Sequence, residues 1–165
     1  MDSATPRDLP AEAPAEALAE EVMRLDRQVC FAVHAASRAF DAVYRPLLRE
    51  LGLTYPQYLA MLALWEHGAL TVKELGLALR LDSGTLSPLL KRLESAGLVR
   101  RERSSRDERQ VTVSLTGPGR ELRRRAAAVP LRIMEATGLD ERELVALHRS
   151  LDRLTAALDT ASGRG

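Results

Sequence analysis

The apolar residues of this chain recur mainly at spacings of three and four, which is the period of amphipathic helices. The first such stretch starts near Glu16 and runs toward Leu48, so we expect one long helix with a bend where Pro46 removes an amide donor. The last stretch follows Asp140 and Glu143, which predict a helix cap. Its apolar stripe consists of Leu144, Leu147, Leu151, Leu154 and Leu158.

Two shorter helices are predicted in the first half of the chain, each opened by a capping box. Thr54 and Gln57 begin a strongly apolar helix that ends near His67, and Thr71 and Glu74 begin the next one. In such a box the first side chain accepts from the amide three residues on. The second side chain reaches back to the first amide, so two amides without helical partners are satisfied.

A third helix is expected to begin at Asp82, whose carboxylate can accept from the amides of the first turn, and to end before Gly97. Residues 111–115 then alternate apolar and polar side chains, which predicts a half-buried strand. The turn-rich Ser-Ser-Arg-Asp-Glu stretch before this strand suits the tip of a hairpin. The apolar positions of the third helix are Leu86, Leu89, Leu90 and Leu93.

After the strand, Thr116 and Pro118 open another helix, and we expect a kink at Val129 and Pro130. The order of elements predicts a mainly α fold with a small β-wing. It is a winged helix-turn-helix domain with N- and C-terminal dimerisation helices. The expected ranges are a disordered tail at 1–15 and one domain at 16–165, with the DNA-reading part at 54–115 and the dimerisation helices at 16–51 and 116–162.

The exposed face of the helix that begins at Asp82 has small polar groups at its start and basic groups further along. This arrangement is typical of a helix whose first turns enter the major groove of DNA. The candidate DNA-binding residues on this face are Ser83, Thr85, Ser87, Lys91 and Arg92.

The predicted hairpin is rich in arginine, and a basic ribbon next to such a helix can lie along phosphates or in the minor groove. We expect Arg106 and Arg109 to bind DNA at its tip, with Asp107 pairing with Arg109 to shape the turn. Arg100, Arg101 and Arg103 add to the basic ribbon.

The charge distribution agrees with this assignment. The whole chain has a net charge of only +1, but residues 80–125 contain 12 basic and 6 acidic side chains, a net charge of +6. Residues 1–29 contain 3 basic and 7 acidic ones, a net charge of −4. A charged helix face or a charged loop alone is more typical of a solvated surface. Their order and spacing together favour double-stranded DNA as the partner.

The remaining composition excludes several classes of protein. The first 15 residues are rich in Ala, Pro and acid and resemble neither a secretory signal nor a membrane anchor. The longest charge-free run, residues 51–65, is too short to span a bilayer, so we expect a cytoplasmic protein without a membrane partner. The single cysteine, Cys30, excludes an intramolecular disulfide and a cysteine-rich zinc site, and no cofactor or metal is expected.

The first and last helices both have long apolar stripes, and a domain of this size has few internal surfaces to cover both. We therefore expect a twofold homodimer, although burial of either stripe against its own domain would give the same pattern. Such a dimer would present its two recognition helices to the half-sites of a pseudo-palindromic operator, about 34 Å apart.

Several motifs resemble the multiple antibiotic resistance regulator (MarR) family over about residues 20–160. They are D-S-G-T-L-S-P-L-L-K-R-L-E, G-L-V-R-R and D-E-R. Within that family, V-C-F-A-V, Y-R-P-L-L and L-T-Y-P-Q-Y-L look like the organic hydroperoxide sensor-repressors, the OhrR group of the single-cysteine type. The resemblance implies a homodimeric repressor that leaves its operator when organic hydroperoxides oxidise Cys30. It also implies that Tyr44 and Tyr55 hydrogen-bond the reactive sulfur.

Helix geometry constrains this implied sensor. If Cys30 and Tyr44 lie on one continuous helix, fourteen residues separate them by about 21 Å, so they cannot touch within one subunit. Contact would require an antiparallel partner helix, which makes a sensor shared between subunits. His34 lies one turn after Cys30, where some relatives have a tyrosine, and is included as a candidate sensor residue.

Alternatives to a redox sensor remain at the level of sequence. A free cysteine on a helix is most often a small buried hydrophobe. A repressor of the same fold could instead be released by a small aromatic or phenolic ligand, with Cys30 only structural. A thiol peroxidase is a third hypothesis, but an enzyme is not expected, because the chain has no resolving cysteine and has a basic wing that such an enzyme does not need.

An oxidised Cys30 would have to react with an external small thiol or a backbone nitrogen, or oxidise further.

Overall fold

The computed structural model describes residues 20–103 and 110–163. The chain divides into two compact units, Met1–Val43 and Tyr44–Gly165, which are considered separately. Within the described ranges, no helix has both the length and the apolar character needed to cross a membrane.

In the first unit, the predicted continuous helix is interrupted. A helical turn at residues 20–23 is followed by the 3-10 helix η1 (Leu25–Arg27), and α2 (Val29–Glu50) begins only afterwards. The expectation of one helix from residue 16 onward is therefore wrong in this stretch. The cause is local, because Arg24 and Gln28 both have extended backbone angles.

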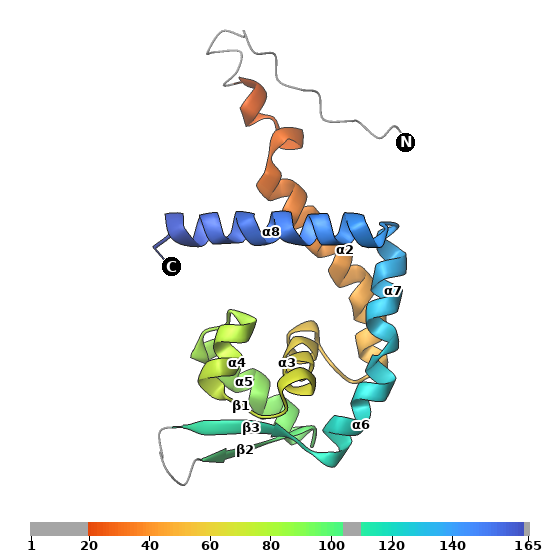
Figure 1. Cartoon of the computed structure of the whole chain (residues 1–165), viewed down its shortest axis with the longest axis vertical. Coiled ribbons are helices and arrows are strands. Elements are labelled where there is room, and N and C mark those ends of the chain that lie inside the picture. The colour runs from red at the N-terminus through yellow and green to blue at the C-terminus, as the bar shows by residue number, and fades with distance from the viewer. Residues whose placement is uncertain (1–19, 104–109, 164–165) are drawn as a thin grey trace. The chain divides into compact units, whose positions relative to one another are not determined.

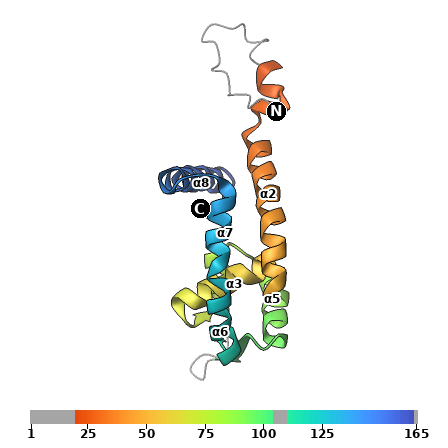
Figure 2. The same ribbon diagram turned by 90° about the vertical axis from the view of Figure 1, so that its right-hand side faces the viewer.

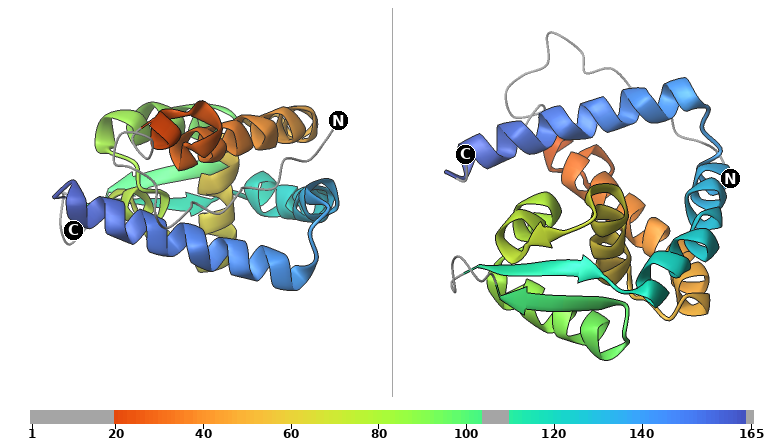
Figure 3. Two further views of the ribbon diagram at one scale, coloured as in Figure 1. Left: turned by 90° about the horizontal axis from the view of Figure 1, so that it is seen from above. Right: turned by 60° about the horizontal axis from the view of Figure 1, so that its bottom comes forward.

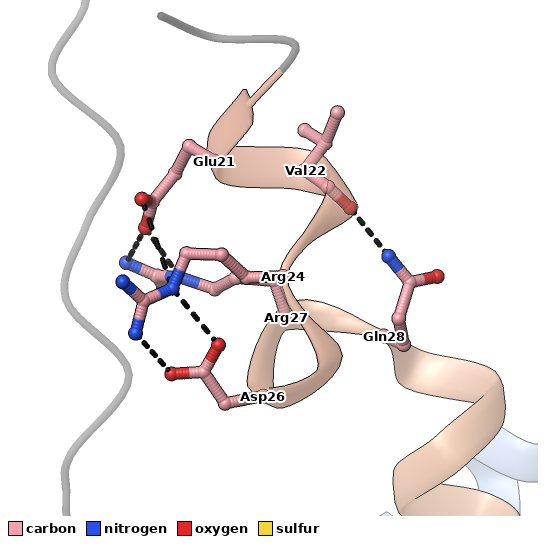
Figure 4. A network of polar contacts seen from close by, with 6 residues as sticks. All are labelled: Glu21, Val22, Arg24, Asp26, Arg27 and Gln28. Carbon is pink, nitrogen blue, oxygen red and sulfur yellow. Dashed lines mark hydrogen bonds and ion pairs between the residues drawn. The ribbon is translucent and has the colours of Figure 1, made fainter.

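A small network of polar side chains surrounds the break between the first helical turn and α2 (Figure 4). The Arg24 guanidinium donates to the Asp26 carboxylate at 2.8 and 3.0 Å, and Arg27 donates to Glu21 at 2.8 Å. The Gln28 side-chain amide donates to the Val22 carbonyl, a group that no longer has a helical partner. The Gln28 contact thus satisfies a backbone carbonyl at the break, and the two ion pairs link side chains around it.

Helix α2 crosses from the first unit into the second and continues past Pro46 to Glu50. No residue of it before Leu48 is buried. The apolar residues of this part of the helix are exposed, among them Val29, Phe31, Val33, Phe40 and Val43.

The second unit contains the hydrophobic core. Helices α3 (Tyr55–His67), α4 (Val72–Leu79) and α5 (Ser83–Ser95) gather on the sheet of β1 (Leu70–Thr71), β2 (Val99–Arg103) and β3 (Val111–Leu115), as Figure 1 shows. The sheet is antiparallel with the strand order β1-β3-β2. Leu64, Leu75, Leu93 and Val113 are fully buried where these elements meet.

The predicted helix starts are confirmed in this unit. The Thr54 amide donates to Gln57 Oε1 at 2.8 Å, and the Thr71 amide donates to Glu74 Oε2 at 2.7 Å. The Asp82 carboxylate accepts from the backbone amide three residues later at 2.9 Å. Each cap is formed by residues within four positions of one another, which is why the sequence pattern predicts them well.

The strand predicted at 111–115 is confirmed as β3, and its register decides which side chains of β2 face the core. Val99 lies opposite Leu115, and Arg101 lies opposite Val113. Directly opposite residues of an antiparallel pair point to the same face. One face of the sheet therefore has the core residues Val99, Val113 and Leu115 together with Arg101, while the other has Arg100, Glu102, Thr112 and Ser114.

The rest of the second unit is helical. Helix α6 (Gly117–Ala126) opens with a cap by Thr116, as predicted, and is followed by α7 (Ala128–Thr137). The break lies at Ala127, before the expected kink at Val129 and Pro130. The reason is that a proline ring clashes with the carbonyl four residues earlier, which here belongs to the last residue of α6.

Helix α8 (Glu141–Ala161) begins at the predicted cap, where the Glu143 amide donates to Asp140 at 2.9 Å. Figure 2 shows α6 and α7 in line, with α8 turning across their far end. None of the residues of α8 is buried, and Leu147, Leu151 and Leu158 are exposed. The second unit thus leaves much of the predicted apolar stripe of its last helix exposed, while Leu144 and Leu154 are half-buried.

Candidate functional site

Helix α5 presents two different faces. Its four predicted apolar residues are at most 7% exposed and are packed in the core. The opposite face is exposed and contains the five residues of this helix that the sequence nominated for DNA binding: Ser83, Thr85, Ser87, Lys91 and Arg92. The 3.6-residue period of a helix accounts for this separation.

The start of α5 is fixed by Asp82. Its carboxylate accepts from the Thr85 amide at 2.9 Å and from the Thr85 hydroxyl at 3.1 Å. The Thr85 amide and hydroxyl, through these hydrogen bonds, hold the pKa of Asp82 below its ordinary value. The negative charge also suits the positive end of the helix dipole. Thr85 is therefore both a surface residue of the DNA-reading face and part of its cap.

Two arginines of the basic ribbon have partners within the protein. Arg101 donates to Glu94, in the last turn of α5, through Nε at 2.9 Å and Nη2 at 2.6 Å. Arg100 donates to the Ser114 hydroxyl at 3.0 Å. Both guanidinium groups therefore have acceptors within the protein, and whether they also contact phosphates stays a prediction. Arg106, Asp107 and Arg109, the nominated residues of the tip, lie outside the described residues.

The base of the ribbon is attached to α3 and α6. The buried Trp65 indole donates to the Gly119 carbonyl at 2.8 Å. A Cβ at Gly119 would lie 2.0 Å from the Leu98 carbonyl oxygen, so only glycine fits this approach. The Thr116 hydroxyl donates to the Gly97 carbonyl at 2.6 Å. Trp65 lies in the helix that the sequence predicts as strongly apolar, but its hydrogen bond could not be predicted, since the partner is 54 residues away.

Tyr44 and Tyr55 are brought together, with ring centroids 4.7 Å apart. Tyr58 continues the cluster 6.0 Å from Tyr44, and it stands 6.4 Å from Trp65 in an edge-on arrangement. Burial, with smaller contributions from Tyr55 and Tyr58, raises the pKa of Tyr44 to about 12. Its phenol is therefore neutral and able to donate a hydrogen bond at any physiological pH. Tyr58 was not nominated, although its position three residues after Tyr55 puts both on one side of α3.

Cys30 and His34 belong to the first unit, on exposed positions of the first two turns of α2. The thiol is 3.9 Å from Gln28 Oε1, a long contact for a hydrogen bond to sulfur. Arg27 and Asp26, the nearest charges in sequence, are paired with Glu21 and Arg24 respectively.

The described residues contain no group of three or more His, Cys, Asp and Glu side chains that could hold a metal ion. His67 lies beside Glu66 and His148 beside Asp152, each as a simple exposed pair. The candidate chemistry of the chain therefore rests on the thiol of Cys30, the tyrosine cluster and the basic face.

Comparison with known proteins identifies the family. The model of the transcriptional regulator SarA/Rot family matches residues 42–125. The organic hydroperoxide resistance transcriptional regulator of Bacillus subtilis (strain 168) is 48% identical over 136 residues, covering 80% of this chain and 92% of that protein. The chain belongs to the SarA/Rot family of transcriptional regulators.

Further relatives agree with the resemblance to MarR-type regulators. The HTH-type transcriptional regulator TtmR of Methylorubrum extorquens (strain PA1) is 49% identical over 147 residues, covering 88% of this chain and 73% of that protein. The structure of reduced AbfR bound to DNA has a TM-score of 0.71 and 37% identity, covering 86% of this chain and 99% of the other. AbfR, from Staphylococcus epidermidis, is also known in overoxidised and disulfide-formed states. The predicted winged helix-turn-helix fold and the assignment as a DNA-binding transcriptional regulator are thus confirmed.

Proposed function

We propose that this protein is a homodimeric repressor that senses organic hydroperoxides through oxidation of Cys30 and then releases its operator. The observation that carries the proposal is the pair formed by Tyr44 and Tyr55. The two phenol rings have centroids 4.7 Å apart, and burial keeps Tyr44 neutral, so the pair is suited to donate hydrogen bonds to a thiolate. The relative from Bacillus subtilis, an organic hydroperoxide resistance regulator, supports the class of oxidant.

The sensor would be shared between subunits. Helix α2 is continuous from Val29 to Glu50, so Cys30 and Tyr44 of one chain lie fourteen positions apart on it, about 21 Å by helical rise. Cys30 would therefore meet the partner's Tyr44 and the partner's Tyr55 across the dimer interface. The exposed apolar residues of α2 and α8 supply the surfaces for such a dimer. His34, one turn from Cys30, would lie beside the sulfur.

The chemistry requires one thiolate and one peroxide. The sulfur attacks the terminal oxygen of the hydroperoxide, the O–O bond breaks, and the departing alkoxide takes a proton and leaves as an alcohol. Cys30 is oxidised by two electrons to a sulfenic acid, and the peroxide is reduced. The chain has one cysteine, so a disulfide would need an external small thiol, which displaces water from the sulfenic acid. Either product adds a polar group where the tyrosines pack.

On the DNA side, the exposed face of α5 would enter the major groove and the wing would contact the backbone. Ser83 and Ser87 would approach the bases, and Lys91 and Arg92 the phosphates. Arg106 and Arg109 would extend the phosphate contacts at the tip, with Asp107 ordering the turn. Oxidation would change the spacing of the two recognition helices and so prevent simultaneous binding of both half-sites.

The test is DNA binding before and after one equivalent of cumene hydroperoxide, with the mass of the Cys30 peptide followed in parallel. Wild-type protein should lose affinity as the peptide gains oxygen. Cys30→Ser should bind DNA when reduced and stay bound at the same peroxide concentration. Release of Cys30→Ser by peroxide as readily as the wild type would refute the sensor assignment.

A second candidate function is release by a small aromatic ligand, with Cys30 structural. It is favoured by a groove of about 1080 Å³ beside α5, which has apolar Val72, Leu77 and Leu86 next to Ser83 and Ser87. A phenolic ligand titrated without oxidant would distinguish the two functions. DNA release by the ligand from Cys30→Ser would support this second function.

A further inference from the structure

One arginine of the wing is directed back at the recognition helix. Arg101 donates to Glu94 through three groups: the backbone amide at 3.0 Å to Oε1, and Nε at 2.9 Å and Nη2 at 2.6 Å to Oε2. Glu94 lies in the last turn of α5 and Arg101 in the middle of β2. The contact therefore joins the two elements that the fold presents to DNA.

The strand register explains why Arg101 is directed at α5. It lies opposite the fully buried Val113 and two positions after Val99, which is 2% exposed. Because side chains alternate along a strand, Arg101 shares the inner face of the sheet with these two. It emerges at the edge of the core, where both Arg101 and Glu94 are about one third exposed, at 33% and 36%.

The ribbon loses its third strand just beyond the level of Arg101. Strand β1 pairs with β3 only at Val113, which lies opposite Arg101, and at Thr112, so the part of the ribbon nearer the tip has two strands. Figure 3 shows β2 and β3 extending past the short β1. A two-stranded ribbon is only marginally ordered in water and needs packing against another element. Arg101 and Glu94 provide such a contact with α5.

We propose that Glu94 and Arg101 act as a brace that sets the direction of the wing relative to the recognition helix, and that both are positioning residues for DNA binding. The proposal rests on the family's role as a DNA-binding regulator and not on the redox sensor. Arg101 acts through Glu94 and the wing and does not need to touch a phosphate. The brace would thus fix how β2 lies against the last turn of α5.

The direction in which removal of Glu94 changes the affinity for DNA distinguishes the brace from a purely electrostatic effect. Glu94 is an acidic group on the DNA-reading segment, so its removal should strengthen phosphate attraction if charge alone matters. The brace predicts the opposite result, because a free ribbon must be ordered again when DNA binds. Glu102 offers a matched control: it lies on the outer face of the sheet, where its partner is Arg100 at 3.5 Å.

The experiment measures the affinity of the full-length reduced protein for a duplex that the wild-type protein selects from a random pool, at several salt concentrations. Glu94→Gln should bind about three- to tenfold more weakly, with a salt slope reduced by about one, as wing contacts are lost. Glu102→Gln should bind equally well or more tightly with an unchanged slope. Wild-type or tighter binding by Glu94→Gln, at the wild-type slope, would overturn the proposal.

A second variant tests Arg101 without a change of charge. Arg101→Lys retains the positive charge but cannot form the two-pronged contact with one carboxylate. A direct phosphate contact would tolerate lysine, whereas the brace predicts weaker binding similar to Glu94→Gln. In the DNA-free protein, the amides of β2 and β3 should exchange hydrogen faster in both variants while those of α3 exchange at the wild-type rate. Unchanged exchange in the strands, or wild-type binding by Arg101→Lys, would contradict the brace.

Discussion

The two units of the chain use their apolar residues in different ways. In residues 44–165, leucine, valine and aromatic side chains from α3, α4, α5 and the sheet are buried in one core. In the described residues of the first unit, 20–43, none is buried, although Val33 and Phe40 are as apolar as the residues of the core. A helix without tertiary packing is only marginally stable in water. An apolar stripe on such a helix is therefore best explained by a partner that covers it, which for this chain we propose is a second copy.

The largest expected effect comes from placing a charge on the uncovered stripes. Val33→Glu on α2 or Leu151→Glu on α8 would bury an unpaired carboxylate in the dimer, a cost of about 3–5 kcal/mol for a charge that cannot reach water. We expect dissociation, measured by analytical ultracentrifugation. Ala156→Glu, at an exposed position of α8 one turn after Asp152 and away from the leucine stripe, is the control and should remain dimeric. A folded dimer for both stripe variants would show that these residues face something other than the partner.

A smaller effect is expected at the tightest contact of the second unit. Gly119→Ala places a Cβ at 2.0 Å from the Leu98 carbonyl oxygen, so the base of the wing must shift. The free energy of unfolding, measured with urea, should fall by about 3 kcal/mol. Gly117→Ala is the matched control, because no atom lies within 4 Å of its added Cβ. Equal stability of the two variants would mean that the contact between Gly119 and Leu98 is easily relieved.

The third prediction concerns the hydrogen bond between Trp65 and Gly119. Trp65→Phe keeps an aromatic ring but leaves the Gly119 carbonyl without its indole donor. We expect the free energy of unfolding to fall by about 1–3 kcal/mol, as measured by denaturation monitored with far-ultraviolet circular dichroism. Leu77→Ala, at an exposed position of α4, should change stability by less than about 0.5 kcal/mol. Wild-type stability of Trp65→Phe would indicate that water replaces the indole.

The smallest effect is a pH dependence at Tyr44. Burial raises its pKa from 10.0 to about 12, so folding favours the neutral phenol. The stabilisation is complete below about pH 10 and is lost as the pH rises from about 10 toward 12. Phenolate absorbance during alkaline titration should show a late-titrating tyrosine that is absent in Tyr44→Phe. Titration of all tyrosines near their ordinary pKa in both proteins would contradict the burial of Tyr44.

Much of the fold could be predicted from short-range patterns. The caps at Thr71, Asp82 and Thr116 involve residues no more than four positions apart, and the buried face of α5 follows from its own periodicity. The same local pattern placed Ser83 and Ser87 on the exposed face. The association of Tyr44 with Tyr55 followed only from the resemblance to hydroperoxide regulators. In the structure the two rings are in contact.

The features that escaped prediction depend on residues distant in the chain or on competing local bonds. From the sequence alone, Arg101 is a candidate for phosphate binding. The register with β3 places it on the inner face of the sheet, beside Glu94. Trp65 and Gly119 are joined across 54 residues, and no local signal marks their hydrogen bond. Periodicity determines which face of an element is apolar. Strand register and packing decide which partner that face meets, because the free energy of a contact depends on segments that the chain brings together only on folding.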